Sequence, residues 1–113
     1  MIQAHFYRSD SVGIYSVTIT GHANSGPYGF DLVCAAVSAL SIGAVNSLAE
    51  LGGYSPNVEI EEAEGGYLSI SLPASINESQ RHTSLILLES LLLSLRSVAD
   101  EYPDYLSIIE HLK

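Results

Sequence analysis

Two residues in the first third of this chain carry the side chains of a cysteine-based catalyst, His22 and Cys34. An imidazole beside a thiol can remove the thiol proton, which makes the sulfur a nucleophile, and can later protonate a leaving amine. Asp31 stands where a helix N-cap would, which predicts that Cys34 lies in the first turn of a helix. Free N–H groups and the helix dipole lower a thiol pKa there. The pattern therefore indicates nucleophilic chemistry.

Each of these residues also has a purely structural interpretation. A lone cysteine commonly packs as a small apolar side chain, and His22 could bond the backbone of a turn. Asp31 could be only an N-cap, or it could orient His22 and complete a triad. Ser38, one helical turn after Cys34, could bond the thiol, the imidazole or a substrate, or return to the carbonyl one turn back. The residues alone leave catalysis and packing open.

Hydrophobic periodicity predicts the elements that must position this pair. Alternation of apolar and polar residues predicts two hairpins, over 2–8 with 14–21 and over 58–61 with 67–72. Apolar residues at steps of three and four predict two helices, from Leu32 to Gly52-Gly53 and from about Asn77 or Glu78 to Asp100. The expected stripe of the first helix is Val33, Val37, Leu40, Ala44, Leu48 and Leu51. The aperiodic, glycine-containing segment 23–30 predicts a mobile loop, and the tail from Asp104 a short strand or turn.

The order of these elements is strand-strand-helix-strand-strand-helix, which predicts one α+β domain over residues 1–113. We expect a two-layer ββαββα sandwich in which a four-stranded, mostly antiparallel sheet carries both helices on one face. Hydrophobic residues make up 47% of the chain and charged residues only 15%. Apolar surface is therefore expected to face a partner, most simply a second copy, through the open sheet face or the alanine-rich helix.

Composition and motifs exclude several classes of function. The formal net charge is −9, so the chain is not expected to bind nucleic acid directly. No histidine pair has metal-ligand spacing with Cys34, and no glycine-rich cofactor motif occurs, so neither a metal nor a cofactor is expected. One cysteine allows no internal disulfide, which fits the cytoplasm. We expect no signal peptide and no membrane span, because the most apolar segment is too short.

Three motifs carry a resemblance to a known family: Gly21-His22-Ala23, Gly29-Phe30-Asp31, and Cys34-Ala35-Ala36-Val37-Ser38 after Val33. With them the chain resembles the ribosomal-processing cysteine proteases. The resemblance extends over nearly the whole chain, through Met1-Ile2-Gln3-Ala4, Gly43-Ala44-Val45-Asn46 and Gly65-Gly66-Tyr67. It implies a homodimeric cysteine endopeptidase that removes an N-terminal extension from ribosomal large-subunit protein number twenty-seven.

By matching positions, the resemblance implies that Cys34 is the nucleophile and His22 the base. Gly21, Asp31 and Ser38 fall on the family's other motif positions, in roles that are either structural or catalytic. For acyl transfer we expect the N–H groups of Cys34 and Ala35 to bind the oxyanion. We also expect the 23–30 loop to cover the site until substrate binds, with Tyr28 or Phe30 lining the groove. The negative charge suits a basic precursor peptide.

Three other functions remain open at the level of sequence. The main alternative is a non-catalytic, ribosome-associated binding dimer in which Cys34 is a packed thiol. A redox-sensing thiol protein is a second alternative, although the chain has no second cysteine to resolve a sulfenic acid. A structural interaction domain is the third. Cleavage motif, substrate pocket and catalytic rate cannot be predicted from the sequence.

Overall fold

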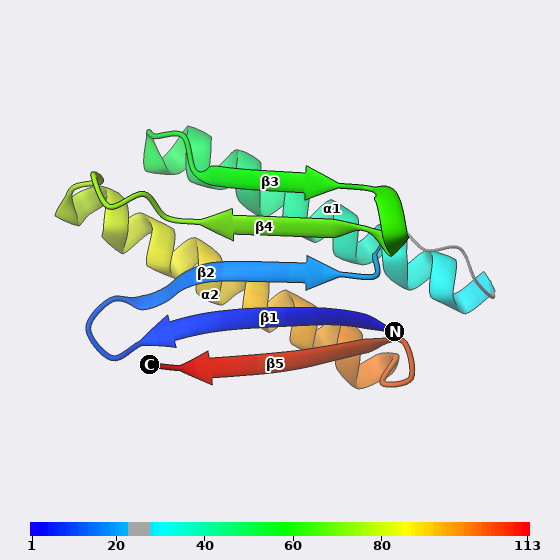
Figure 1. Ribbon diagram of the computed structural model, residues 1–113. Coiled ribbons are helices and arrows are strands. Elements are labelled where there is room, and N and C mark those ends of the chain that lie inside the picture. Colours follow the sequence, from blue (N-terminus) through cyan, green and yellow to red (C-terminus); the bar gives the residue numbers. More distant parts are fainter. Residues whose placement is uncertain (23–27) are drawn as a thin grey trace.

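The computed structural model describes residues 1–22 and 28–113. In that part of the chain, five strands form one sheet and two helices cover one of its faces (Figure 1). The elements in chain order are β1 (Ile2–Ser9), β2 (Gly13–Thr20), α1 (Tyr28–Gly52), β3 (Asn57–Glu61), the short 3-10 helix η1 (Ala63–Gly65), β4 (Tyr67–Ser71), α2 (Glu78–Glu101) and β5 (Leu106–Leu112). Both predicted hairpins and both predicted helices are therefore present.

The sheet differs from the prediction in one strand. Its order is β3-β4-β2-β1-β5, with antiparallel neighbours except for β5, which runs parallel to β1. The predicted four-stranded sheet is thus a five-stranded mixed sheet. The tail becomes a strand because α2 runs back across the sheet and delivers Leu106 beside Ile2. In that position β5 covers the edge that β1 would otherwise expose.

One continuous hydrophobic core lies between the sheet and the two helices. The strands contribute alternate residues such as Phe6, Val17 and Ile70, and the helices contribute residues such as Leu48 and Leu95, all of them fully buried. By length and composition alone both helices could cross a membrane, a test that core helices of soluble proteins also pass. Here they pack across the sheet, which is what the predicted two-layer arrangement requires (Figure 1).

The stripe predicted for α1 is buried only in part. Val37 and Leu48 have no exposed surface, but Leu51 is 67% exposed, because it lies in the last turn of the helix, where it projects away from the sheet. Helix α2 begins with a capping box: the Asn77 side chain accepts from the Gln80 N–H, and the Gln80 side chain accepts from the Asn77 N–H. These two bonds satisfy donors that the first turn of a helix leaves free.

The start of α1 also differs from the prediction, and this changes the site. The helix begins at Tyr28 rather than Leu32, so Asp31 lies inside its first turn and is not the N-cap. Cys34 therefore lies in the second turn. The expectation was wrong because the glycines of the 23–30 segment suggested a loop, whereas Gly29 is already helical.

Candidate active site

Gly21 fixes the entry into the site at the end of β2. Its backbone has φ = +86°, in the left-handed region that favours glycine. Its N–H donates to the carbonyl of Gly66 at 3.2 Å, which ties this turn to the start of β4. A Cβ atom at this position would lie 2.7 Å from the Met1 carbonyl oxygen, so the chain packs too closely for a side chain. Glycine is therefore required here, and it sets the direction of His22.

His22 follows directly and is half-buried. Its Nδ1 atom is buried and has no hydrogen-bond partner in the described part of the chain. Burial lowers the pKa of the His22 imidazole below its ordinary value, and the negative charge of Glu62 opposes that shift. The lowered pKa favours the neutral imidazole, which is the form able to accept a proton.

Cys34 projects from the second turn of α1 into the edge of the core, where it is 7% exposed. Burial raises the pKa of the Cys34 thiol, the negative charge of Asp31 raises it further, and the positive charge of the Met1 amino group opposes both effects. The pKa is therefore raised, whereas a first-turn position was expected to lower it. The expectation was wrong because the helix starts earlier, which takes the thiol away from the free N–H groups of the N-terminus.

A cavity lies beside His22 and is lined by the helix that carries Cys34. It has a volume of about 220 Å³ and lies between α1 and the β3–β4 half of the sheet. We call it the α1–β3 pocket; its lining residues are His22, Ser38, Ser41, Ile42, Ile60, Glu62 and Leu68. Ser38 lies one helical turn after Cys34 and on the same face of α1. His22 thus borders a pocket whose helical wall continues directly to the Cys34 thiol.

Both pKa shifts favour the neutral forms of the two groups. A neutral imidazole is the form that can act as a general base. Burial and Asp31 both disfavour the thiolate, so a base is needed to remove the thiol proton. No group of three or more metal-binding side chains occurs in residues 1–22 and 28–113. The chemistry available to these residues is proton transfer and nucleophilic attack by sulfur.

Two predicted supporting roles need revision. The N–H groups of Cys34 and Ala35 lie beyond the first four residues of α1, where backbone N–H groups bond within the helix. They are therefore not free to bind an oxyanion as expected. The exposed side chain of Asp31 lies in the first turn and acts electrostatically on Cys34. Its proposed function as an orienter of His22 stays a prediction.

The aromatic residues expected to line a substrate groove are placed as follows. Phe30 is 7% exposed and packs edge-on against Tyr105, with ring centroids 5.7 Å apart at 84°. It is a core residue, because this face of the first turn is turned toward the start of β5. Of the predicted 23–30 cover, residues 28–30 belong to α1 instead of a loop, whereas residues 23–27 and the Tyr28 side chain lie outside the part of the structure that is described.

Sequence reasoning missed five of the seven residues that line the pocket, and the two polar ones among them are Ser41 and Glu62. Ser41 follows Ser38 by three positions and Cys34 by seven, a spacing that places all three on one face of a helix. That spacing was available as a signal. Glu62 was interpreted as part of an acidic hairpin tip, and only the pairing of β3 with β4 and β4 with β2 brings it beside His22.

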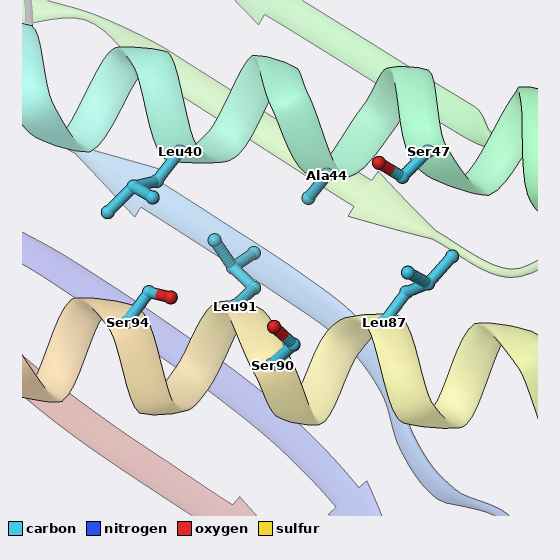
Figure 2. A pocket seen from close by; sticks show the side chains of 7 residues that line it. All are labelled: Leu40, Ala44, Ser47, Leu87, Ser90, Leu91 and Ser94. Atoms are coloured by element: carbon cyan, nitrogen blue, oxygen red, sulfur yellow. The ribbon is translucent and has the colours of Figure 1, made fainter.

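A separate groove lies between the two helices. Figure 2 shows Leu40, Ala44 and Ser47 of α1 facing Leu87, Ser90, Leu91 and Ser94 of α2. The groove has a volume of about 120 Å³ and holds no titratable side chain. It therefore offers no titratable acid or base, whereas the α1–β3 pocket is bordered by His22.

Comparison with known proteins shows which proteins this chain resembles. A sequence model of the family described as cysteine protease Prp matches residues 1–107. The ribosomal processing cysteine protease Prp of Bacillus subtilis is 39% identical over 112 residues, which cover 99% of each chain. A crystal structure of a Streptococcus mutans protein superposes with a TM-score of 0.90 at 38% identity, covering 100% of this chain and 96% of that one.

A further structure, of an essential ribosomal processing protease Prp from Staphylococcus aureus, was solved in complex with a substrate peptide. It superposes with a TM-score of 0.77 at 27% identity, covering 98% of this chain and all of that one. The similarity thus extends from the sequence to the whole fold.

Proposed function

The chain belongs to the cysteine protease Prp family, and we propose that it cleaves the extended precursor of ribosomal large-subunit protein number twenty-seven with Cys34 as nucleophile and His22 as base. One observation carries the assignment of these two residues. His22 and Ser38 line the same pocket, and Ser38 stands one turn after Cys34 on the same helix face. His22 thus borders a cavity that can hold part of a peptide, and the helix face that lines this cavity also carries Cys34.

The reaction follows from acyl-transfer chemistry. His22 accepts the thiol proton as the Cys34 sulfur attacks the scissile carbonyl carbon. The tetrahedral intermediate collapses, the peptide C–N bond breaks, and the imidazolium gives its proton to the departing amine. A water molecule then attacks the thioester, His22 takes its proton, and the N-terminal fragment leaves as a carboxylic acid while the thiol is restored. Every step uses groups that border the pocket or adjoin it.

The electrostatics of the site favours a basic substrate. The chain carries a formal charge of −9, and Glu61, Glu62 and Glu64 are exposed beside the pocket. A negative surface of this kind attracts a positively charged peptide and raises its encounter rate. We propose the extended precursor of a ribosomal protein as the substrate, and we expect its peptide to be positively charged.

The burial of Cys34 is the one observation that favours the alternative, a non-catalytic binding dimer with a packed thiol. The two functions separate in one experiment. Purified wild type, Cys34→Ala and His22→Ala are each incubated with the extended precursor, and the products are analysed by intact mass. Loss of one defined N-terminal peptide with wild type alone supports the protease. An intact precursor in all three reactions refutes the proposal and favours the binding dimer.

We also propose that the enzyme is a cytoplasmic homodimer. Several large apolar side chains are exposed on the helical layer, among them Leu32, Ile42, Leu51 and Leu93. A second copy would remove such surface from water. Sedimentation equilibrium is expected to give twice the chain mass of 12.1 kDa, and a monomer at micromolar concentration would contradict this assembly.

A further inference from the structure

Ser41 is a buried polar residue that the reaction above does not use. It has no exposed surface, and its hydroxyl has no hydrogen-bond partner in the described residues. A buried hydroxyl without a partner costs about 1–3 kcal/mol, and such groups are rare. Ser84, the other fully buried serine described, shows the usual outcome: its hydroxyl donates to the Gln80 carbonyl at 2.7 Å and pairs with the Tyr54 hydroxyl at 2.6 Å.

The position of Ser41 offers a reason for this cost. It lines the α1–β3 pocket together with His22, whose Nδ1 is the other buried side-chain atom without a partner in residues 1–22 and 28–113. Two unsatisfied polar atoms from distant parts of the sequence therefore border one cavity. A ligand that brings a hydrogen-bonding group into the pocket would satisfy them.

The remaining walls of the pocket define the rest of such a ligand. Ile42 and Ile60 are 42% and 51% exposed, which is unusual for large apolar side chains, and Leu68 lies behind them at 3%. These three residues present an apolar surface that a methylene chain or an aromatic ring would cover. At about 220 Å³ the cavity is smaller than the roughly 300–1,000 Å³ of drug-sized pockets, so it suits one side chain.

The charge of the pocket restricts the end of that side chain. Glu62 is exposed at the pocket and repels a carboxylate. Glu62 also attracts cations to the exposed part of the pocket, but a cation that reached the fully buried Ser41 would have to give up its hydration shell, which is unfavourable unless the charge is fully paired there. An uncharged donor or acceptor meets neither penalty. Ser38 and Ser41 can each donate or accept one hydrogen bond to such a group.

We propose that the α1–β3 pocket is a substrate subsite for a side chain with an apolar stem and an uncharged hydrogen-bonding end, of the glutamine or tyrosine class, and that Ser41 recognises this end. The proposal rests on the proposed protease function, because it concerns the peptide that the enzyme cleaves. Ser41 is then a specificity-determining residue that does not touch the scissile bond.

The test uses peptides that span the cleavage site, with each of the four residues on either side of the scissile bond replaced in turn. At each position glutamine is compared with methionine, which has similar length but no strong hydrogen-bonding group, and lysine is added as a charged competitor. The ratio of kcat/KM values is measured for wild type, Ser41→Ala and the matched control Ser47→Ala, which alters a serine of α1 in the interhelical groove.

At one position wild type is expected to prefer glutamine over methionine by about 10-fold, the equivalent of one hydrogen bond. Ser41→Ala should reduce this ratio to below about 2-fold, and Ser47→Ala should leave it unchanged. A ratio that survives in Ser41→Ala, a ratio near one at every position in wild type, or a preference for lysine would each overturn the subsite. Failure of wild type to cleave any peptide would instead refute the protease function itself.

A second measurement tests whether Ser41→Ala changes specificity only because the variant is less stably folded. Because the Ser41 hydroxyl has no partner in the free enzyme, its removal should not lower the midpoint of thermal unfolding. A clear decrease in Ser41→Ala would show that the hydroxyl is satisfied inside the fold, and this would also overturn the proposal.

Discussion

Replacement of Gly21 by alanine tests how the fold positions His22, the proposed catalytic base. An alanine at φ = +86° is strained by about 1–2 kcal/mol. Its Cβ would also lie 2.7 Å from the Met1 carbonyl oxygen and 3.3 Å from the Ile2 Cα, both backbone atoms that cannot turn aside, which adds about 1–3 kcal/mol. The free energy of unfolding should therefore fall by roughly 2–5 kcal/mol, and the thermal midpoint by about 10–20 °C.

The same change should impair cleavage more than stability alone explains. The strain is relieved if the turn that carries His22 moves away from β1, and a displacement of about 1 Å in a catalytic group can cost about 100-fold in rate. The assay is kcat/KM for precursor cleavage at a temperature where circular dichroism shows the variant to be folded. Gly43→Ala is the matched control, because a Cβ there meets nothing within 4 Å. That control should gain about 1 kcal/mol of stability and keep its activity. If Gly21→Ala were as stable and as active as wild type, the argument that this glycine fixes His22 would be refuted.

Three further predictions follow from the same structure. First, Cys34 should react with iodoacetamide at pH 8 more slowly in the folded enzyme than in the chain unfolded by urea, because burial and Asp31 raise the pKa of its thiol. For the same reason the folded Asp31→Asn variant should react faster than folded wild type. An equal rate in folded and unfolded chains would contradict this. Since that pKa is raised in the folded state, the neutral thiol contributes stability below the unfolded pKa of about 8.5, and this contribution is lost as pH rises toward the folded pKa. The thermal midpoint should therefore fall above about pH 8.5 in wild type and should fall less in Cys34→Ala. Second, Asn77→Ala removes half of the capping box of α2 and should lower the free energy of unfolding by about 1 kcal/mol with kcat/KM unchanged, whereas an unaltered urea midpoint would show that the cap contributes nothing. Third, kcat/KM for the basic precursor should decrease as the salt concentration is raised from about 0.01 M to 0.15 M, because the screening length falls from about 30 Å to 8 Å. A kcat/KM that does not depend on salt would contradict the proposed role of the −9 charge.

Local patterns predicted most of the secondary structure of this chain. The hairpins of β1 with β2 and of β3 with β4 were predictable because burial of one sheet face requires an apolar residue at every second position. Ala4, Phe6, Val17 and Ile19 show this alternation. The partner of β5 was not predictable in this way. Its pairing with β1 joins Ile2 to Leu106, across nearly the whole chain, and depends on where α2 ends rather than on the residues of the strand.

The structure brings two of the predicted site residues together, because His22 and Ser38 line the same pocket. The catalytic roles of His22 and Cys34 stay predictions, and the expected electrostatics of the thiol was wrong. The predicted direction of the shift in the Cys34 pKa was wrong because the prediction depended on which residue begins α1. Helix boundaries are the least certain part of a pattern-based prediction. A start four residues earlier moved Cys34 from the free N–H groups into the edge of the core.

The pocket itself could be predicted only in part. The Cys34, Ser38 and Ser41 spacing marks one helix face, and this much is visible in the sequence. Which residues oppose that face is decided by the sheet order, which places Ile60 and Leu68 beside it. Non-local pairing of this kind leaves no trace in the local sequence pattern.

The central claim is that the Cys34 sulfur forms a covalent acyl intermediate with the substrate. The most direct test mixes enzyme and extended precursor, stops the reaction with acid after a short time, and measures the intact mass of the enzyme. The account predicts an added mass equal to the released N-terminal peptide less one water, located at Cys34 by fragmentation and removed by hydroxylamine, as expected of a thioester. Cleavage of the precursor by Cys34→Ala, or an adduct at any other residue, would contradict it.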